Sequence, residues 1–200
     1  GNSIIDGGEL TCVGAPQQIA KNIKDSLELW KKDTFTAGAY LNYPDKVESL
    51  AEKMLPTYHW LEDEIGVKFS QTALTQDGGH SVPRSVITEN GSGSGYINPL
   101  LEQCKKLGVK CLTRQYVQHV FRDAKTGQVQ GVEVRSGYRF PKAESGKVKT
   151  ICARKAVILC HGGFAADVKY RMMLDPRLTD KFEITNQPGA TGEMWREASR

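Results

Sequence analysis

The sequence predicts an α/β fold in which helices flank the strands of a parallel sheet and a small antiparallel meander is inserted. Residues 156–160 form a short apolar run closed by two glycines, as in a buried parallel strand whose carboxyl end meets a ligand. Two earlier stretches, residues 16–30 and 44–65, place apolar side chains at helical spacing. From Val117 onward apolar and polar residues alternate, which is typical of paired strands.

Both helical stretches carry an amphipathic stripe, which predicts two helices packed on the domain. Asp45, beside Pro44, is expected to cap the second helix at its N-terminus, and Gly66 is expected to end it. His59 lies inside the second stripe and is assigned no chemistry. The apolar positions are Ile19, Ile23, Leu27 and Trp30 in the first stretch, and Val47, Leu50, Met54, Leu55, Tyr58, Trp60 and Leu61 in the second.

A polar cluster follows a short strand expected over residues 67–74. Residues 76–84 hold His80 and Arg84 around a pair of glycines, with Pro83 marking a turn. A histidine and an arginine beside a glycine turn suit the binding of a carboxylate or of a cofactor. A hydrogen-bonded loop without any ligand suits the same residues equally, so both interpretations stay open, and a lone histidine does not identify a general acid.

The glycine-rich run at residues 91–95 is not a dinucleotide-binding fingerprint. It lacks the Gly-x-Gly-x-x-Gly spacing, and no apolar strand directly precedes it. The run instead opens a helix expected over residues 96–107, which Gly108 ends. Residues 109–112 are expected to form a strand after this helix.

The alternating stretch predicts an antiparallel meander over residues 117–151. A turn is expected at residues 123–127 and a second, longer one at residues 136–147. His119 lies at a strand position and is interpreted as a surface or packing residue. Beyond the apolar run, a polar helix is expected over residues 166–173, and Thr191 and Gly192 are expected to open the last helix.

Composition and charge exclude several classes of protein. The 200 residues suit one domain or a large part of one, and 39 % apolar residues suffice for a core. The net charge of +4 is spread along the chain without a basic block, which argues against a nucleic-acid surface. The five cysteines include no Cys-x-x-Cys pair, so no zinc, iron–sulfur or haem attachment motif is present. They are interpreted as reduced thiols, several of them in or beside strands, with a disulfide between neighbouring strands as the alternative.

Five segments occur in a fixed order along nearly the whole chain. They are residues 1–8 with Gly1, Asn2, Ser3, Gly7 and Gly8, residues 79–84 with Gly79, His80, Ser81 and Arg84, the helix and strands of residues 92–134, residues 155–165, and residues 185–193. In this order they resemble the FAD-binding domain of the fumarate reductase and flavocytochrome c flavoprotein family. That family also includes urocanate reductases, 3-ketosteroid dehydrogenases and, more distantly, L-aspartate oxidases and succinate dehydrogenase flavoproteins.

The resemblance implies a partial Rossmann-like domain that binds FAD. By position in the family pattern, Asn2, Ser3, Gly7 and Gly8 would contact the flavin, and Val117, Gly162 and Gly163 the adenosine side, while Gly189 and Thr191 complete the cofactor set. Glycine suits such positions because backbone N–H groups reach phosphate or an anionic flavin where no side chain blocks approach. His80 and Arg84 are the candidates for substrate binding, and neither a metal site nor a catalytic residue is assigned.

Three positions depart from the family pattern. Cys160 and His161 stand where alanine and threonine are common, and Glu193 stands where aspartate is usual. Two interpretations of His161 stay open, a contact to the nucleotide part of the cofactor and a packed imidazole. Glu193 keeps an acidic group at a helix N-terminus but changes its reach.

Two parts of the family pattern do not occur in this sequence. The Gly-x-Gly-x-x-Gly unit that precedes the matched segments is absent, and the clamp domain with its acid and carboxylate-binding residues follows the last matched segment in the family order. Residues 1–200 therefore correspond to the central part of a single FAD-binding domain, with the meander inside it.

The function implied is hydride transfer between flavin and the C=C bond of an unsaturated carboxylate such as fumarate or urocanate. The parent enzyme would take such a carboxylate or a dicarboxylate as substrate, and a haem or FMN electron-donor domain is compatible with the family. These activities and the FAD are those of the parent enzyme, whereas the 200 residues alone are expected to be inactive and not to retain FAD. The alternatives are a folded fragment that retains no cofactor and associates with itself, or a parent enzyme acting as a 3-ketosteroid dehydrogenase or an L-aspartate oxidase. The sequence leaves an exported and a cytoplasmic location equally open.

Overall fold

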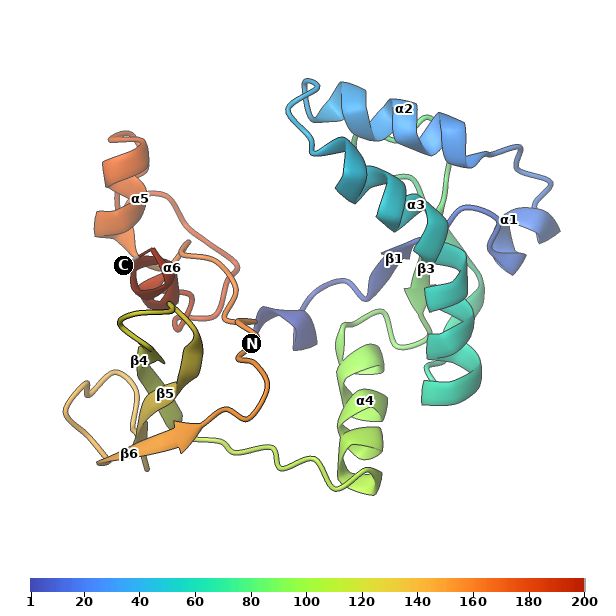
Figure 1. Cartoon of the computed structure of the whole chain (residues 1–200). Coiled ribbons are helices and arrows are strands. Elements are labelled where there is room, and N and C mark those ends of the chain that lie inside the picture. The colour runs from blue at the N-terminus through green and yellow to red at the C-terminus, as the bar shows by residue number, and fades with distance from the viewer. Residues whose placement is uncertain (200) are drawn as a thin grey trace. The chain divides into compact units, whose positions relative to one another are not determined.

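The chain folds into two compact units in a computed structural model that describes residues 1–199. The N-terminal unit is Ser3–Lys110, and the C-terminal unit joins Gly1–Asn2 to the chain from Cys111 onward (Figure 1). The first unit contains both helices and strands, and a meander and two short helices make up most of the second. The α/β fold class is therefore confirmed.

A three-stranded antiparallel sheet and the surrounding helices form the N-terminal unit. The strands are β1 (Glu9–Thr11), β3 (Ser85–Thr88) and β2 (Phe69–Thr75), in the order β1-β3-β2. The helices are α1 (Pro16–Ala20), α2 (Leu27–Ala37), α3 (Pro44–His59), the π-helix η2 (Trp60–Ile65) and α4 (Ser94–Lys106). A short 3₁₀-helix, η1 (Asn2–Ile4), precedes them and begins at the last residue assigned to the other unit. The predicted helix ended by Gly108 is confirmed as α4, and Gly108 has a φ of 71°.

Two groups of buried apolar side chains hold this unit together. One lies against the sheet and contains Tyr58, Val67, Phe69 and Val86, with the rings of Tyr58 and Phe69 stacked 4.6 Å apart. The other joins α2 to α3 through Trp30 and neighbouring side chains. Burial of such side chains contributes about 1.5–3 kcal/mol each. The predicted stripes are therefore only partly the inner faces of the helices, since Ile19, Leu50 and Trp60 are 71 %, 61 % and 41 % exposed.

The first predicted helix, residues 16–30, is interrupted. Asn22 adopts a left-handed conformation with a φ of 52°, which ends α1, and Ser26 then caps α2 by accepting a hydrogen bond from the Leu29 amide at 3.1 Å. The second predicted helix begins at Pro44, where Tyr43 is the N-cap, so the assignment of Asp45 as cap was wrong. Its end at Gly66 is confirmed by a φ of 85°.

The predicted meander is confirmed as an antiparallel sheet in the C-terminal unit. Its strands are β4 (Gln115–Arg122), β5 (Val129–Ser136) and β6 (Lys147–Cys152), in that order. Asp123 forms the first turn by accepting hydrogen bonds from the amides of Lys125 and Thr126. The two predicted helices beyond it are α5 (Val168–Leu174) and α6 (Glu193–Ala198).

The parallel sheet is absent from the described residues, in which both sheets are antiparallel. Residues 109–112 and 156–160, both predicted as strands, form none, and Ile158 is 85 % exposed. A strand exists through hydrogen bonds to a neighbouring strand, and no other strand within residues 1–199 pairs with these runs. The apolar character of residues 156–160 suits the interior of a sheet, but it does not specify a neighbouring strand with which they could pair.

Two further properties concern the chain as a whole. Within residues 1–199, none of the helices combines the length and apolar character that crossing a bilayer requires. The five cysteines are unpaired as predicted, but Cys12 alone is buried, while Cys104 is partly exposed and Cys111, Cys152 and Cys160 are exposed. Cys12 directly follows β1 and Cys152 is the last residue of β6, so two of the five lie in or beside strands, whereas Cys104 lies in α4.

Candidate cofactor site

A cavity of about 190 Å³ in the C-terminal unit brings together three of the predicted cofactor residues, Val117, Gly189 and Thr191. We call it the β4–α6 cavity, because its walls are the start of β4 and the start of α6. Its lining consists of Gln115, Tyr116, Val117, His161, Gly189, Thr191, Gly192, Glu193 and Met194. Segments more than 70 residues apart in the sequence thus meet at one place, as the predicted cofactor set requires.

Strand β4 is irregular where it borders the cavity. Val117 pairs with Val134 of β5, the register then shifts, and the next paired residue is His119. Such a bulge leaves one residue outside the regular ladder and increases the local twist. The backbone next to Val117 therefore makes fewer hydrogen bonds to β5 than the rest of the strand does.

The opposite wall is a tight loop that leads into α6. The Ala190 amide donates to the Gln187 carbonyl at 2.9 Å, and the Ala190 carbonyl accepts from the Ala166 amide at 2.9 Å. Gly192 then adopts a left-handed φ of 65°, and a Cβ at this position would lie 2.5 Å from the Cβ of Phe164. Glycine is therefore required at residue 192 both by its conformation and by its close packing.

Asn2 fastens the first residues of the chain to this loop. Its side-chain oxygen accepts a hydrogen bond from the Gln187 amide at 2.7 Å, and its side-chain nitrogen donates to the Asn186 side chain. Both groups lie within the C-terminal unit. The predicted cofactor residue Asn2 thus has a definite structural role next to Gly189, and its amide group is already engaged by two partners.

Gly162, Gly163 and Gly189 leave open space where a side chain would stand. A Cβ built at any of the three would meet no heavy atom within 4 Å. Trp195 holds this backbone in place, because its indole N–H donates to the Gly162 carbonyl at 2.9 Å. The ring of Trp195 also lies 6.1 Å from the ring of His161. An open, glycine-lined backbone of this kind fits the close approach of a bulky cofactor.

The charge of Glu193 faces a tyrosine in the cavity wall. Burial raises the pKa of Tyr116 to about 12, with further contributions from the Glu193 carboxylate and the hydrogen bond to it. The ring of Tyr116 stacks on Tyr138 at 4.7 Å, so the turn between β5 and β6 supports this wall. Tyr116 therefore remains a neutral phenol at physiological pH and offers an aromatic face and a polar tip.

Ser3, Gly7 and Gly8 belong to the N-terminal unit and do not line the β4–α6 cavity. Gly8 is committed to internal packing there. Its amide donates to the Asp6 carboxylate at 2.8 Å, and a Cβ at this position would lie 2.2 Å from the Thr88 hydroxyl. This glycine is therefore explained by close packing, which differs from the open space at Gly189.

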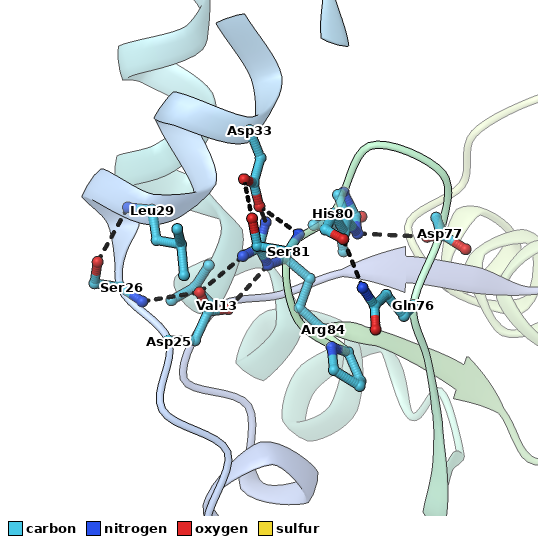
Figure 2. A network of polar contacts seen from close by, with 12 residues as sticks. Val13, Asp25, Ser26, Leu29, Asp33, Gln76, Asp77, His80, Ser81 and Arg84 are labelled. Atoms are coloured by element: carbon cyan, nitrogen blue, oxygen red, sulfur yellow. Dashed lines mark hydrogen bonds and ion pairs between the residues drawn. The ribbon is translucent and has the colours of Figure 1, made fainter. Parts of the chain in front are cut away.

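Arg84, predicted to bind a substrate carboxylate, is instead committed to two internal carboxylates. Its side chain is fully buried and donates to Asp25 through Nε at 3.0 Å and Nη2 at 2.9 Å, and to Asp33 through Nη1 at 2.7 Å (Figure 2). Asp33 also accepts a hydrogen bond from the Ser81 amide at 2.8 Å. The alternative of a hydrogen-bonded loop, left open by the sequence, describes this residue.

His80 lies on the same loop, with its Nδ1 atom 3.9 Å from a carboxylate oxygen of Asp77 (Figure 2). Nδ1 is buried and has no hydrogen-bond partner within the part of the chain that the structure describes. The loop itself is held by the Gln76 side chain, which donates to the His80 carbonyl at 2.7 Å. The imidazole therefore remains a candidate for contact with a ligand.

Sequence reasoning missed two features of the site. Gln115 and Tyr116 line the cavity, although the predicted meander began at Val117. Arg171 is the second buried arginine, 6 % exposed, and it lies in a helix assigned no role. The signal available for Tyr116 was its place directly before Val117. Nothing in the spacing around Arg171 distinguished it from an exposed basic residue.

Comparison with known proteins identifies the group to which this geometry belongs. A family model described as "FAD binding domain" matches residues 1–200. The chain belongs to the FAD-binding domain family. FAD is therefore the cofactor against which the open glycines and the β4–α6 cavity are judged. Within residues 1–199, no group of three or more His, Cys, Asp or Glu side chains is placed to hold a metal ion.

Curated relatives cover the whole of the chain. It is 39 % identical over 200 residues to the acrylate reductase flavoprotein subunit of Shewanella woodyi, 31 % over 194 residues to the urocanate reductase of Eggerthella lenta, and 31 % over 198 residues to a fumarate reductase (cytochrome) of Shewanella frigidimarina. The three alignments include 100 %, 96 % and 96 % of this chain, but 39 %, 30 % and 32 % of the relatives. The chain thus spans 30–39 % of the length of these relatives.

Solved structures agree on the fold. The open conformation of a flavocytochrome c3 fumarate reductase matches with a TM-score of 0.86 and 27 % identity, covering 100 % of this chain and 33 % of that one. Mycobacterium smegmatis Sdh1 in complex with UQ1 matches with a TM-score of 0.65 and 22 % identity, covering 84 % and 29 %. The first match supports the predicted family, and the second shows the fold alone.

Proposed function

We propose that this chain is the central part of a FAD-dependent oxidoreductase that transfers a hydride between flavin and the C=C bond of an unsaturated carboxylate. The observation that carries the proposal is the β4–α6 cavity, where Val117, Gly189 and Thr191 meet although they come from distant segments. The reductases of acrylate, urocanate and fumarate among the relatives support this class of substrate. Their shared feature is a double bond next to a carboxylate.

In the proposed mechanism, bound FAD supplies the hydride chemistry at its flavin ring. The part of this chain is to bind and orient the cofactor. The backbone at Val117 and the open glycines Gly162, Gly163 and Gly189 would hold its adenosine side. Asn2 positions the loop that carries Gly189 and Thr191, while Ser3, Gly7 and Gly8 are proposed to face the flavin. His80 is proposed to meet the substrate, and no residue of this chain is assigned as the proton donor.

The first test is retention of the cofactor. The purified chain is incubated with FAD and desalted, and its visible absorption is recorded. A retained flavin band with resolved vibronic structure would show that these residues hold the ring away from water by themselves, whereas a colourless protein would mean that cofactor binding needs further parts of the parent enzyme.

Substitution at Gly189 adds the matched control. A Cβ at Gly189 and one at Gly78 of the N-terminal unit both meet open space, so both Gly189→Ala and Gly78→Ala are expected to fold with unchanged stability. Gly189→Ala is expected to weaken FAD binding about tenfold, because the methyl group occupies the space that the cofactor approaches. Equal FAD affinity of the two variants would contradict a cofactor at this cavity.

A second candidate function is favoured by one specific observation. Ile158 is 85 % exposed and Leu159 41 % exposed in a run without sheet partners among the described residues. An uncovered apolar segment of this kind promotes association. The 200-residue chain alone would then be a folded, cofactor-free polypeptide that associates with itself, and the reductase activity would belong to a longer protein.

Substrate preference separates the remaining reactions. Where flavin is retained, the chemically reduced chain is mixed in turn with acrylate, urocanate and fumarate without oxygen, and reoxidation of the flavin band is followed. The oxidised chain is mixed separately with a 3-ketosteroid and with L-aspartate, either of which would give electrons to the flavin and bleach its band. Reoxidation by an unsaturated carboxylate would support the proposed substrate class, and bleaching by the steroid or by L-aspartate without such reoxidation would contradict it.

A further inference from the structure

Arg171 is a buried cation whose hydrogen-bond acceptors are all backbone carbonyl oxygens. Its Nε donates to Leu178 at 2.9 Å, its Nη1 to Ala165 at 2.9 Å, and its Nη2 to Phe182 at 3.0 Å and also to Thr179. The residue is 6 % exposed. A planar guanidinium presents donors in fixed directions, so four carbonyls are oriented by one side chain.

Through these carbonyls Arg171 reaches both ends of the loop of residues 183–191, which carries predicted cofactor residues. At the far end, Ala165 is followed by Ala166, whose amide donates to the Ala190 carbonyl at 2.9 Å. Phe182 directly precedes the loop of residues 183–191, which contains Gly189 and Thr191. Arg171 therefore fixes the point where the 183–191 loop begins and, through Ala166, the point where it closes.

The middle of the same loop is held independently by Asn2, through its bonds to Asn186 and Gln187. The three attachments come from the chain terminus, from α5 and from the segment before α5. None of them passes through the β4–α6 cavity itself, because Arg171 does not line that cavity. The position of the 183–191 loop is thus set by contacts outside the β4–α6 cavity, which leave the cavity side of the loop open.

We propose that Arg171 is a positioning residue that sets the 183–191 loop for the cofactor. This inference rests on the proposed function as far as the cofactor is concerned, but the order of the loop is a property of the chain alone. The charge of Arg171 is balanced by carbonyl dipoles, so loss of the side chain frees several carbonyls at once. The loop would then move relative to Val117 without any change in a residue that touches FAD.

Arg177 supplies the matched control. It is an arginine six positions later, its side chain is 87 % exposed, and it pairs with the Asp175 carboxylate at 2.7 Å. Arg171→Met and Arg177→Met remove the same charge from the same region. Arg171→Lys keeps the charge but replaces the planar fork with a single ammonium group.

The experiment measures amide hydrogen exchange of the apo chain together with FAD affinity. For Arg171→Met we expect exchange over residues 178–190 to rise about tenfold and FAD binding to weaken about tenfold, with β4, β5 and β6 unchanged. Arg177→Met is expected to match the wild type in both measurements. Arg171→Lys is expected to resemble Arg171→Met, because charge without the fork orients fewer carbonyls.

The two parts of the experiment fail separately. If the wild type binds no FAD, the proposed function fails, while exchange over residues 178–190 still decides the role of Arg171. Unchanged exchange over these residues in Arg171→Met would overturn the inference. Increased exchange that extends through β4, β5 and β6 in both Arg171 variants would also overturn it, because Arg171 would then hold the unit together rather than position one loop.

Discussion

The ion pairs of Arg84 lie in the interior of the N-terminal unit. The side chains of Arg84, Asp25 and Asp33 are 0 %, 3 % and 7 % exposed, and the guanidinium bonds to both carboxylates. A buried charge without its partner is costly, since neither water nor another cation replaces it. The loop of residues 76–84 is therefore tied to α2 by a network that depends on every member.

Arg84→Met is accordingly expected to lower the free energy of unfolding by about 3–5 kcal/mol, because it leaves two buried carboxylates unpaired. Lys31→Met is the control, since Lys31 pairs with Glu48 at 3.2 Å where the two side chains are 25 % and 55 % exposed. Its expected cost is below about 1 kcal/mol. Urea denaturation checks both, and equal losses would contradict the structural role of Arg84.

The acid stability of the chain depends in part on Asp33. Burial by itself raises the pKa of Asp33, but hydrogen bonds from the Ser81 hydroxyl and amide and from Arg84 outweigh it and lower the pKa from 3.8 to about 2. A carboxyl with a lowered pKa in the folded state stabilises the protein above its unfolded pKa. This contribution is lost as the pH falls from 3.8 toward about 2.

Asp33→Asn tests this dependence. The difference in unfolding free energy between the wild type and Asp33→Asn should be largest above pH 4 and should shrink as the pH falls toward about 2. Urea titrations at several pH values provide the measurement. A difference that stays constant over this range would show that the Asp33 carboxyl has the same pKa in the folded and unfolded states.

At the level of helices and strands, the end of η2 is set by Gly66. This residue has a φ of 85°, and a Cβ built on it meets no atom within 4 Å. Replacement therefore introduces backbone strain without any steric clash. Gly66→Ala is expected to cost about 1–2 kcal/mol, the penalty of an L-residue in the left-handed region.

Gly78→Ala is the control, because Gly78 also faces open space but does not adopt a positive φ. It should be neutral or slightly stabilising, since alanine restricts the unfolded chain. Thermal unfolding of both variants gives the comparison. Equal melting temperatures would rule out strain at Gly66 as the reason for glycine there.

Local signals predicted the elements that depend on nearby residues. Gly66 and Gly108 marked helix ends, and alternation marked the meander, because caps, turns and hairpins involve neighbours in sequence. Residues 156–160 were placed wrongly because a strand needs a distant partner, which an apolar run does not specify. Helix α1 was joined to α2 because the periodicity of apolar residues passes over the turn at Asn22.

The same distinction applies to the candidate site. The resemblance supplied Val117, Gly189 and Thr191, and the fold brings these residues to one cavity. The resemblance did not supply the partners of Arg84 or Arg171. Asp25 lies 59 positions before Arg84, and the partners of Arg171 are backbone carbonyls, which every residue has, so no sequence pattern marks them. Buried arginines are therefore recognised through their three-dimensional contacts.

For the molecule as a whole, the exposed apolar run predicts self-association. Ile158 is 85 % exposed in the C-terminal unit and Ile19 is 71 % exposed in the N-terminal unit. Ile158→Lys is expected to shift the chain toward monomers in sedimentation velocity, because a charge disfavours pairing of an uncovered strand-like segment. Ile19→Lys, an isolated exposed residue, should leave the distribution unchanged. A wild type that is monomeric at every concentration would contradict the prediction.

The single buried cysteine gives the chain a built-in probe of its own opening. Cys12 is 0 % exposed in the core of the N-terminal unit, and burial raises the pKa of its thiol to about 12. The thiolate is the reactive form, so Cys12 is inert to thiol reagents while the core is closed. Under native conditions the other four cysteines should react first, and the fifth equivalent should appear as the core opens. The slow phase of alkylation therefore reports the rate of that opening without any engineered label.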